Sequence, residues 1–171
     1  QKARVLQEQF NAMATMANAL VEAALPLWQQ TPPTPVHGDL KLENVIDSFG
    51  AAVLVDWEMF GLGDPAYEVA TFLQSSQADL DADGQAAWLN TYLTAFDQPG
   101  LAQRIGVYQR ILPFQAVCYL LHGLRQQPPH ELPLLRESQQ FLVSTLAAAF
   151  QQAVQVLHVE PAAIDDAIQG L

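Results

Sequence analysis

The chain has 171 residues, of which half are hydrophobic and only 15% are charged, compared with ~25% in an average soluble domain. Eighteen acidic residues against seven basic ones give a formal net charge of -11. This balance argues against a nucleic-acid partner and against an anionic membrane surface, because both require a basic patch.

The cysteine content and the N-terminus give weaker indications. Cys118 is the only cysteine, so no disulfide can form within one chain, and a cytoplasmic location is expected. No run of 18 apolar residues predicts a transmembrane helix, and no signal peptide pattern is present. Because the chain begins without a methionine and within a helical pattern, we expect it to be part of a longer protein.

The first half of the chain is predicted to hold a helix and a β-hairpin. Apolar residues recur at helical spacing over residues 4–25, and Pro26 is expected to end that helix. Residues 44–47 and 51–58 are rich in strand-forming residues and are separated by a short turn, which predicts a hairpin. Residues 31–35 and 61–65 are interpreted as a linker and a loop.

The second half is predicted to be helical. Helices are expected over residues 66–76, 81–96, 101–125, 132–157 and 161–170. Pro113 is expected to bend its helix. Trp57, Trp88 and His122 are expected in or near the core. The fold class is therefore mainly α, with one small hairpin.

The stretch "VHGDLKLENVI" at residues 36–46 carries the strongest chemical signal. Phosphoryl transfer needs a carboxylate that orients the attacking hydroxyl and oxygen ligands that hold Mg²⁺ on the nucleotide phosphates. Asp39, Asn44 five residues later and Asp56 on the second predicted hairpin strand could supply this set. Protein kinases have the same Asp-to-Asn spacing in the pattern H-R-D-L-x-x-x-N.

"HGDLKLENVI" followed by "VLVDWEMFGLGDPAYEVA" closely resembles the aminoglycoside phosphotransferase and choline kinase-like family of small-molecule kinases. That family shares its C-terminal lobe with the protein kinases. The resemblance implies that residues 1–171 form the mainly α C-terminal lobe of a protein-kinase-like fold, whose hairpin carries the metal-binding Asp. It also implies ATP and Mg²⁺ as cofactors and a small-molecule hydroxyl as acceptor. The acceptor itself is not indicated by the sequence.

The resemblance assigns a role to each residue of the motif. Asp39 is the catalytic base, and Asn44 and Asp56 bind the metal and with it the nucleotide. His37 holds the loop by packing and a hydrogen bond. Gly38 stands where protein kinases have Arg, which suits a small-molecule kinase.

Other residues near the motif have two interpretations or a weaker match. Asp64 and Glu68 would brace the catalytic loop, although the family usually has Asp at the position of Glu68. Lys41 would reach the transferring phosphate or be a surface lysine. Glu58 would contact a second metal or a cationic acceptor, or be a solvated acid at a strand end.

The nucleotide-clamping N-terminal lobe of such kinases is not recognisable. No G-x-G-x-x-G or Walker pattern occurs, and the only lysines are Lys2 and Lys41. We therefore expect that this lobe was cut off, was lost, or is supplied by a partner chain, and that the chain alone is weakly active or inactive.

The sequence leaves two alternative functions open and excludes a third. A protein or peptide kinase is favoured by "DLKLEN", but "DWE" replaces D-F-G and no A-P-E segment is found. A non-catalytic kinase-like lobe that acts as a binding module is the second. The third is a calcium loop at "DLDADG", residues 79–84. It is rejected because Asn90 occupies the position of the bidentate Glu, and a helix N-terminus is predicted there instead. The family resemblance implies that the late helices build much of the acceptor site, so Tyr108, Arg110 and Tyr119 of the helix over 101–125 are candidates for it.

Overall fold

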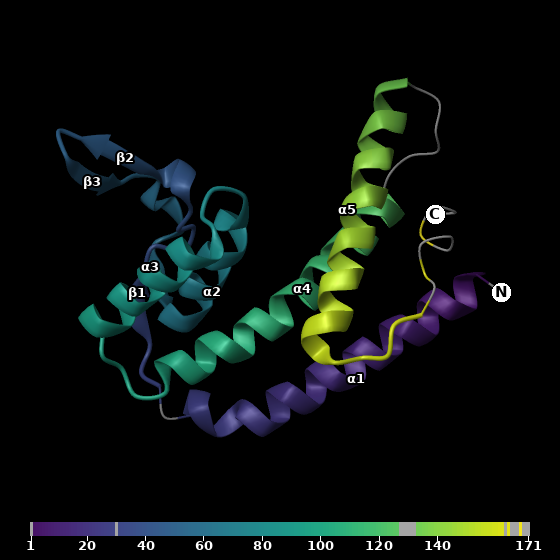
Figure 1. The fold of residues 1–171 in the computed structure, drawn as a ribbon, viewed down its shortest axis with the longest axis horizontal. Coiled ribbons are helices and arrows are strands. Elements are labelled where there is room, and N and C mark those ends of the chain that lie inside the picture. Colours follow the sequence, from purple (N-terminus) through teal and green to yellow (C-terminus); the bar gives the residue numbers. More distant parts are fainter. Residues whose placement is uncertain (1, 30, 127–132, 163, 165–167, 169–171) are drawn as a thin grey trace. The chain divides into compact units, whose positions relative to one another are not determined.

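The computed structural model describes residues 2–29, 31–126, 133–162, 164 and 168 (Figure 1). The α-helices in this part of the chain are α1 (Lys2–Gln29), α2 (Pro65–Ser75), α3 (Ala82–Ala95), α4 (Leu101–Gln126) and α5 (Pro133–Leu157). The strands are β1 (Thr34–Val36), β2 (Val45–Ser48), β3 (Ala51–Leu54) and β4 (Gly61–Gly63), and short 3₁₀ helices lie at η1 (Leu42–Asn44), η2 (Trp57–Met59) and η3 (Ser76–Ala78). The fold is mainly α, which confirms the predicted class.

The chain divides into two compact units. The first combines Gln1–Glu22 with Arg110–Leu171, and the second is Ala23–Gln109. In the first unit, α1, α4 and α5 contribute a core whose fully buried members include Met13, Val117 and Phe150. This burial follows from the helical period of apolar residues in each helix.

The core of the second unit lies between α2, α3 and the first turns of α4. Val69 and Phe72 of α2 and Ile105 of α4 are buried there. Trp88 of α3 lies over the Phe72 ring, with 4.4 Å between the ring centroids, so the expected near-core position of this tryptophan is confirmed. The strands of this unit lie outside the core and carry the loops described below.

The predicted hairpin is present, but its second strand is shorter than expected. β2 and β3 pair antiparallel in the register Val45↔Leu54 to Ser48↔Ala51. Positive φ angles of 55° at Phe49 and 85° at Gly50 form the two-residue turn that matches the twist of a hairpin. β3 ends at Leu54 rather than at residue 58, because the backbone leaves the extended region at Asp56.

A second two-stranded sheet was not predicted. β1 and β4 pair antiparallel, with Thr34 opposite Gly63 and Val36 opposite Gly61. Both strands were interpreted as linker or loop, since three-residue stretches that contain Pro or Gly have low strand propensity. Their pairing joins segments far apart in the sequence and places the residues after Val36 close to those before Gly61.

Several boundaries and placements differ from the predictions. α1 continues through Pro26 to Gln29, where the Trp28 indole N–H donates to the Tyr108 hydroxyl at 2.9 Å and anchors the last turn. As expected, Pro113 lies within a single helix, α4 from Leu101 to Gln126, and the bend at Pro113 stays a prediction. His122 is exposed rather than in the core. The helix predicted over 161–170 falls largely outside the described residues. No helix in the described ranges is long and apolar enough to cross a membrane.

Candidate active site

His37 is the buried start of the motif loop. Its side chain is 4% exposed, and Nε2 lies 2.8 Å from the Val55 carbonyl oxygen. The Asp39 backbone N–H lies 3.3 Å from the other ring nitrogen, Nδ1. Because a carbonyl can only accept and a backbone N–H can only donate, these bonds require the tautomer with its proton on Nε2. The Trp57 ring covers the imidazole, with 4.6 Å between the centroids.

The Asp39 carboxylate is held by two neighbours. Lys41 Nζ donates to Asp39 Oδ2 at 2.6 Å, and Asn44 Nδ2 donates to the same oxygen at 3.1 Å and to the Asp39 backbone oxygen at 2.9 Å. The hydrogen bond from Lys41 lowers the pKa of Asp39, and the reciprocal bond raises the pKa of Lys41. Asp39 is therefore an anion at neutral pH, and its other oxygen, Oδ1, accepts no hydrogen bond from any residue that the structure describes.

Asn44 is oriented by the same contacts. The residue is 6% exposed and ends η1, directly before β2. Its Nδ2 is committed to Asp39, while its Oδ1 accepts no hydrogen bond from any described residue. Since no fully buried side-chain nitrogen or oxygen lacks a partner in that part of the chain, this amide oxygen reaches the surface. An amide oxygen in this position is a suitable ligand for a hard cation.

The hairpin register brings Asp56 next to Asn44. The Val55 N–H donates to the Asn44 carbonyl oxygen at 3.0 Å, which continues the β2–β3 pairing by one residue, and Asp56 follows. Asp56 adopts a left-handed conformation, with φ 65° and ψ 55°. Such a conformation costs a non-glycine residue about 1–3 kcal/mol and often occurs at functional sites. The charge of Asp56 contributes to the raised pKa of Lys41, so the two side chains lie within electrostatic reach.

Asn44 and Asp56 could hold Mg²⁺ only together with other ligands. Among the described residues, no three His, Cys, Asp or Glu side chains gather into a group that would hold a metal. Mg²⁺ is commonly bound by one or two protein oxygens, several waters and substrate phosphates. One amide oxygen and one carboxylate therefore fit a magnesium ion that arrives with a phosphate ligand, rather than a site built by protein alone.

Gly38 and Glu68 connect the loop to α2. The Gly38 N–H donates to Glu68 Oε2 at 2.7 Å. Gly38 has a φ of 87°, and a Cβ atom there would collide with the Met59 carbonyl group. The structure thus gives a local reason for glycine at this position, because a side chain would need both a strained backbone and displacement of Met59.

Asp64 contacts α2 and α4. It is the N-cap of α2, where Oδ1 accepts from the Ala66 N–H at 3.0 Å. Arg104 Nε lies 3.2 and 3.1 Å from its two carboxylate oxygens. Arg104 was missed by the sequence analysis, although an arginine among the apolar residues of a helix is a recognisable signal for a buried ion pair.

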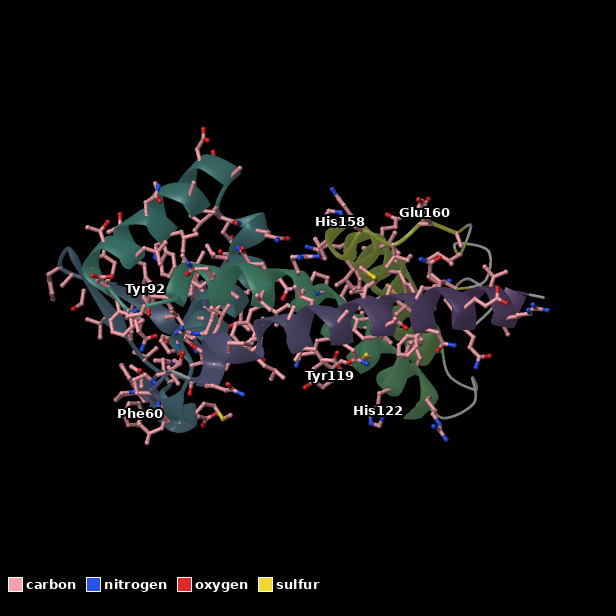
Figure 2. The ribbon with its side chains drawn as sticks, turned by 90° about the horizontal axis from the view of Figure 1, so that it is seen from below. Phe60, Tyr92, Tyr119, His122, His158 and Glu160 are labelled. Carbon is pink, nitrogen blue, oxygen red and sulfur yellow. The ribbon has the colours of Figure 1, made fainter. Side chains whose placement is uncertain are left out.

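An exposed apolar segment follows Asp56. Trp57, Met59, Phe60 and Leu62 are exposed, and Figure 2 shows the Phe60 ring pointing away from the ribbon. The expectation that Trp57 is a core anchor is wrong, since the left-handed turn at Asp56 carries the chain away from the hydrophobic core of the unit. Glu58 is exposed and makes no hydrogen bond or ion pair with any residue that the structure describes.

The late-helix candidates have structural partners or lie at the surface. Tyr108 is half-buried, and burial followed by the nearby charge of Asp64 raises its pKa to about 12. In the first unit, Arg110 donates to the Val156 carbonyl oxygen at 3.0 Å, and Tyr119 is exposed. None of these contacts assigns an acceptor site.

Negative charge is concentrated in Ala23–Gln109. This unit contains eleven acidic residues and two basic ones. Both basic residues are already in ion pairs, Lys41 with Asp39 and Arg104 with Asp64. The unit therefore offers a polyanion no unpaired lysine or arginine.

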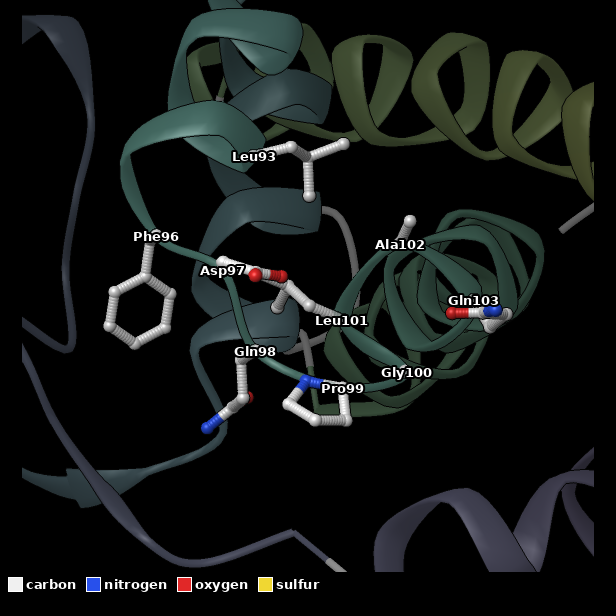
Figure 3. A pocket seen from close by; sticks show the side chains of 9 residues that line it. All are labelled: Leu93, Phe96, Asp97, Gln98, Pro99, Gly100, Leu101, Ala102 and Gln103. Atoms are coloured by element: carbon white, nitrogen blue, oxygen red, sulfur yellow. The ribbon is translucent and has the colours of Figure 1, made fainter.

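A shallow hollow lies elsewhere in the same unit, where α3 is connected to α4 (Figure 3). Its volume is about 260 Å³, and its lining runs from Leu93 and Phe96 through Pro99 to Gln103. None of the motif residues lines it, and its volume is below the ~300 Å³ of the smaller ligand pockets. It adds no residue to the candidate site.

A mainly α chain with a loop that begins at the buried His37, a Lys–Asp–Asn cluster and an Asp after a short hairpin has the parts of a phosphotransferase. Residues 1–107 match the family model described as the phosphotransferase enzyme family, and the chain belongs to that family. No curated protein and no solved structure matches it significantly. The matched range includes the whole candidate site, from His37 to Arg104.

Proposed function

We propose that this chain is the acceptor-binding and catalytic part of an ATP-dependent kinase that phosphorylates a hydroxyl group of a small molecule. The observation that carries the proposal is the Asp39 carboxylate, which is ionised, fixed through Oδ2 by Lys41 and Asn44, and open at Oδ1. In the transfer, the acceptor oxygen forms a bond to the γ-phosphorus while the bond to the leaving ADP oxygen breaks. The proton of the acceptor hydroxyl goes to Asp39.

In this proposal, Asp39 mainly orients the hydroxyl. A carboxylate whose pKa is below its ordinary value is a weak base, so it accepts the proton only as the new oxygen–phosphorus bond forms. Lys41, whose side chain is 38% exposed, is placed to turn its ammonium group from Asp39 toward the transferring phosphoryl group.

Asn44 and Asp56 are the proposed magnesium ligands, through the amide oxygen and the carboxylate. Mg²⁺, when bound with the nucleotide, would neutralise charge on the phosphates. The acidic surplus of Ala23–Gln109 supports this dependence, since a free nucleotide would be repelled. Because acidic residues outnumber basic ones in this unit, we expect the cationic contacts to the phosphates to come from a further lobe or a partner chain.

The proposal is tested by calorimetric titration of Mg-ATP into the chain, its Asp56→Ala variant and a matched control, Asp79→Ala. Asp79 is an exposed acid of the same unit outside the motif. We expect binding to require Mg²⁺, to be retained in Asp79→Ala and to be lost in Asp56→Ala. Equal affinity in all three proteins, or equal affinity with and without Mg²⁺, would contradict the proposed ligand set.

A further inference from the structure

Arg104 is a fully buried arginine with several bonds. Its Nε pairs with Asp64, Nη1 donates to the Pro99 carbonyl oxygen at 3.0 Å, and Nη2 donates to the Gln98 side-chain oxygen. A buried guanidinium is costly to desolvate, and an apolar pair of similar volume often stabilises a fold equally well. Stability alone therefore does not account for a buried guanidinium at this position.

The contacts of Asp64 lead to the catalytic loop. Asp64 caps α2 through the Ala66 N–H, and Glu68 lies four residues further on, in the first turns of the same helix. Residues four apart lie on the same helix face. Glu68 accepts the Gly38 N–H at 2.7 Å, and Gly38 directly precedes Asp39.

Gly38 has little room to follow a displacement of α2. Its left-handed backbone passes so close to the Met59 carbonyl group that a Cβ atom would not fit. Glu68 and Met59 therefore hold the residue before Asp39. A shift at the N-terminus of α2 changes the Glu68–Gly38 bond before it changes the distant parts of the unit.

We propose that Arg104 is a positioning residue for Asp39, which acts through Asp64, the first turn of α2 and the Glu68–Gly38 hydrogen bond. The proposal rests on the proposed function of Asp39 in phosphoryl transfer. It differs from a purely stabilising role, because it predicts a selective effect at Gly38 rather than a uniform loss of stability.

The test is hydrogen exchange of assigned backbone amides, measured by NMR on the full chain. Arg104→Lys keeps the charge but loses the planar fork that joins Asp64, Pro99 and Gln98. The double variant Arg104→Met, Asp64→Asn removes both charges, and the amide oxygen of the new asparagine can still cap α2. This variant therefore provides a folded protein for the test if Arg104→Lys does not fold. The matched control is Arg110→Lys on the same helix; among the described residues, the Arg110 guanidinium donates only to the Val156 carbonyl oxygen.

In Arg104→Lys and in the double variant, we expect the Gly38 amide to exchange at least ten-fold faster, with a smaller change at the Val69 amide inside α2. Arg110→Lys should leave both rates unchanged. The proposal is overturned if Gly38 and Val69 accelerate by the same factor, because Arg104 would then only stabilise the unit.

A kinetic measurement provides a second readout. In the variants of Arg104, we expect kcat for phosphoryl transfer to fall at least ten-fold while KM for Mg-ATP changes less than two-fold. A raised KM with unchanged kcat would also overturn the proposal. Transfer by this chain alone is expected to be weak or absent, so the proposed function fails if ATP binding depends neither on Mg²⁺ nor on Asp56, whereas the exchange rates decide whether Arg104 controls Gly38.

Discussion

Arg104 and Asp64 form a buried ion pair in which one guanidinium nitrogen faces both carboxylate oxygens, at 3.2 and 3.1 Å. The Arg104 side chain is 0% exposed and that of Asp64 is 15% exposed. Asp64 also caps α2, so one carboxylate both begins that helix and neutralises an arginine of α4. Two separate free-energy contributions therefore depend on one side chain.

Asp64→Ala should destabilise the Ala23–Gln109 unit strongly. The change leaves a buried cation without its partner, which costs about 3–5 kcal/mol, compared with about 1 kcal/mol for the loss of an N-cap alone. The matched control is Asp81→Ala, since Asp81 caps α3 by accepting the Gly84 N–H at 2.8 Å and forms no ion pair with any described residue.

The free energies of unfolding are measured by urea denaturation followed by tryptophan fluorescence. All three tryptophans of the chain lie in this unit, so the signal reports it directly. Equal losses in Asp64→Ala and Asp81→Ala would show that the ion pair contributes nothing beyond the cap.

The ionisation of Asp39 should depend on Lys41. The hydrogen bond from Lys41 lowers the pKa of Asp39 below its ordinary value of 3.8, so Lys41→Met should raise it. Because the folded pKa is the lower one, the contribution of Asp39 to stability is present above pH ~4 and is lost as the pH falls through the folded pKa.

Carbon-13 NMR titration of the aspartate carboxyl groups measures this shift in both proteins. Glu43→Gln is the control, because Glu43 acts on Lys41 but makes no hydrogen bond to Asp39. An unchanged Asp39 pKa in Lys41→Met would mean that the Lys41–Asp39 contact is not populated in solution.

The Tyr108 hydroxyl should lose its proton at a higher pH than that of an ordinary tyrosine. Its pKa of about 12 results first from burial and then from the charge of Asp64, whereas the bond from the Trp28 indole lowers it. Asp64→Asn is therefore expected to lower the pKa of Tyr108 and Trp28→Phe to raise it. Since the folded pKa of Tyr108 lies above the unfolded one, the contribution of Tyr108 to stability is complete below pH ~10 and is lost as the pH rises toward the folded value.

NMR titration of carbon-13-labelled tyrosine rings measures these shifts. Burial also raises the pKa of Tyr92, so Tyr92 in the same spectra is a second raised signal that Trp28→Phe should not move. Shifts of Tyr108 in the same direction in both variants would contradict the assigned causes.

The long helices and the hairpin were predictable because their signals are local. A helical period over 14 or more residues identifies α3, α4 and α5 to within one or two residues at each end. The pairing of β1 with β4 was not predictable in this way. Each strand has three residues, and only contact between distant segments makes them strands.

The candidate site was found from spacing, while its supports were not. The distance of five residues between Asp39 and Asn44 is visible in the sequence, and the structure joins them by two hydrogen bonds. Arg104 lies 40 residues after its partner Asp64, and no local pattern connects them. The left-handed turn at Asp56 was not predicted, because the residues up to 58 have strand propensity and propensity does not indicate a positive φ angle at a single residue.

Substitutions at Gly38 and Gly50, which have nearly equal φ angles, allow the cost of backbone strain to be measured separately from the cost of steric overlap. Gly38 has a φ of 87° and Gly50 one of 85°, but a Cβ at Gly38 meets the Met59 carbonyl, while a Cβ at Gly50 meets nothing within 4 Å. Gly50→Ala should therefore cost only the left-handed strain, about 1–2 kcal/mol. Gly38→Ala should cost the same strain plus about 1–3 kcal/mol for overlap.

Urea denaturation followed by tryptophan fluorescence measures both variants, since both glycines lie in the Ala23–Gln109 unit. In Gly38→Ala the backbone must move away from Met59, and the Gly38–Glu68 hydrogen bond must lengthen with it. That variant should therefore also lose phosphoryl transfer, whereas Gly50→Ala, at the tip of the β2–β3 hairpin, should keep it. Equal destabilisation by the two substitutions would mean that the close approach of Met59 to Gly38 does not exist in solution.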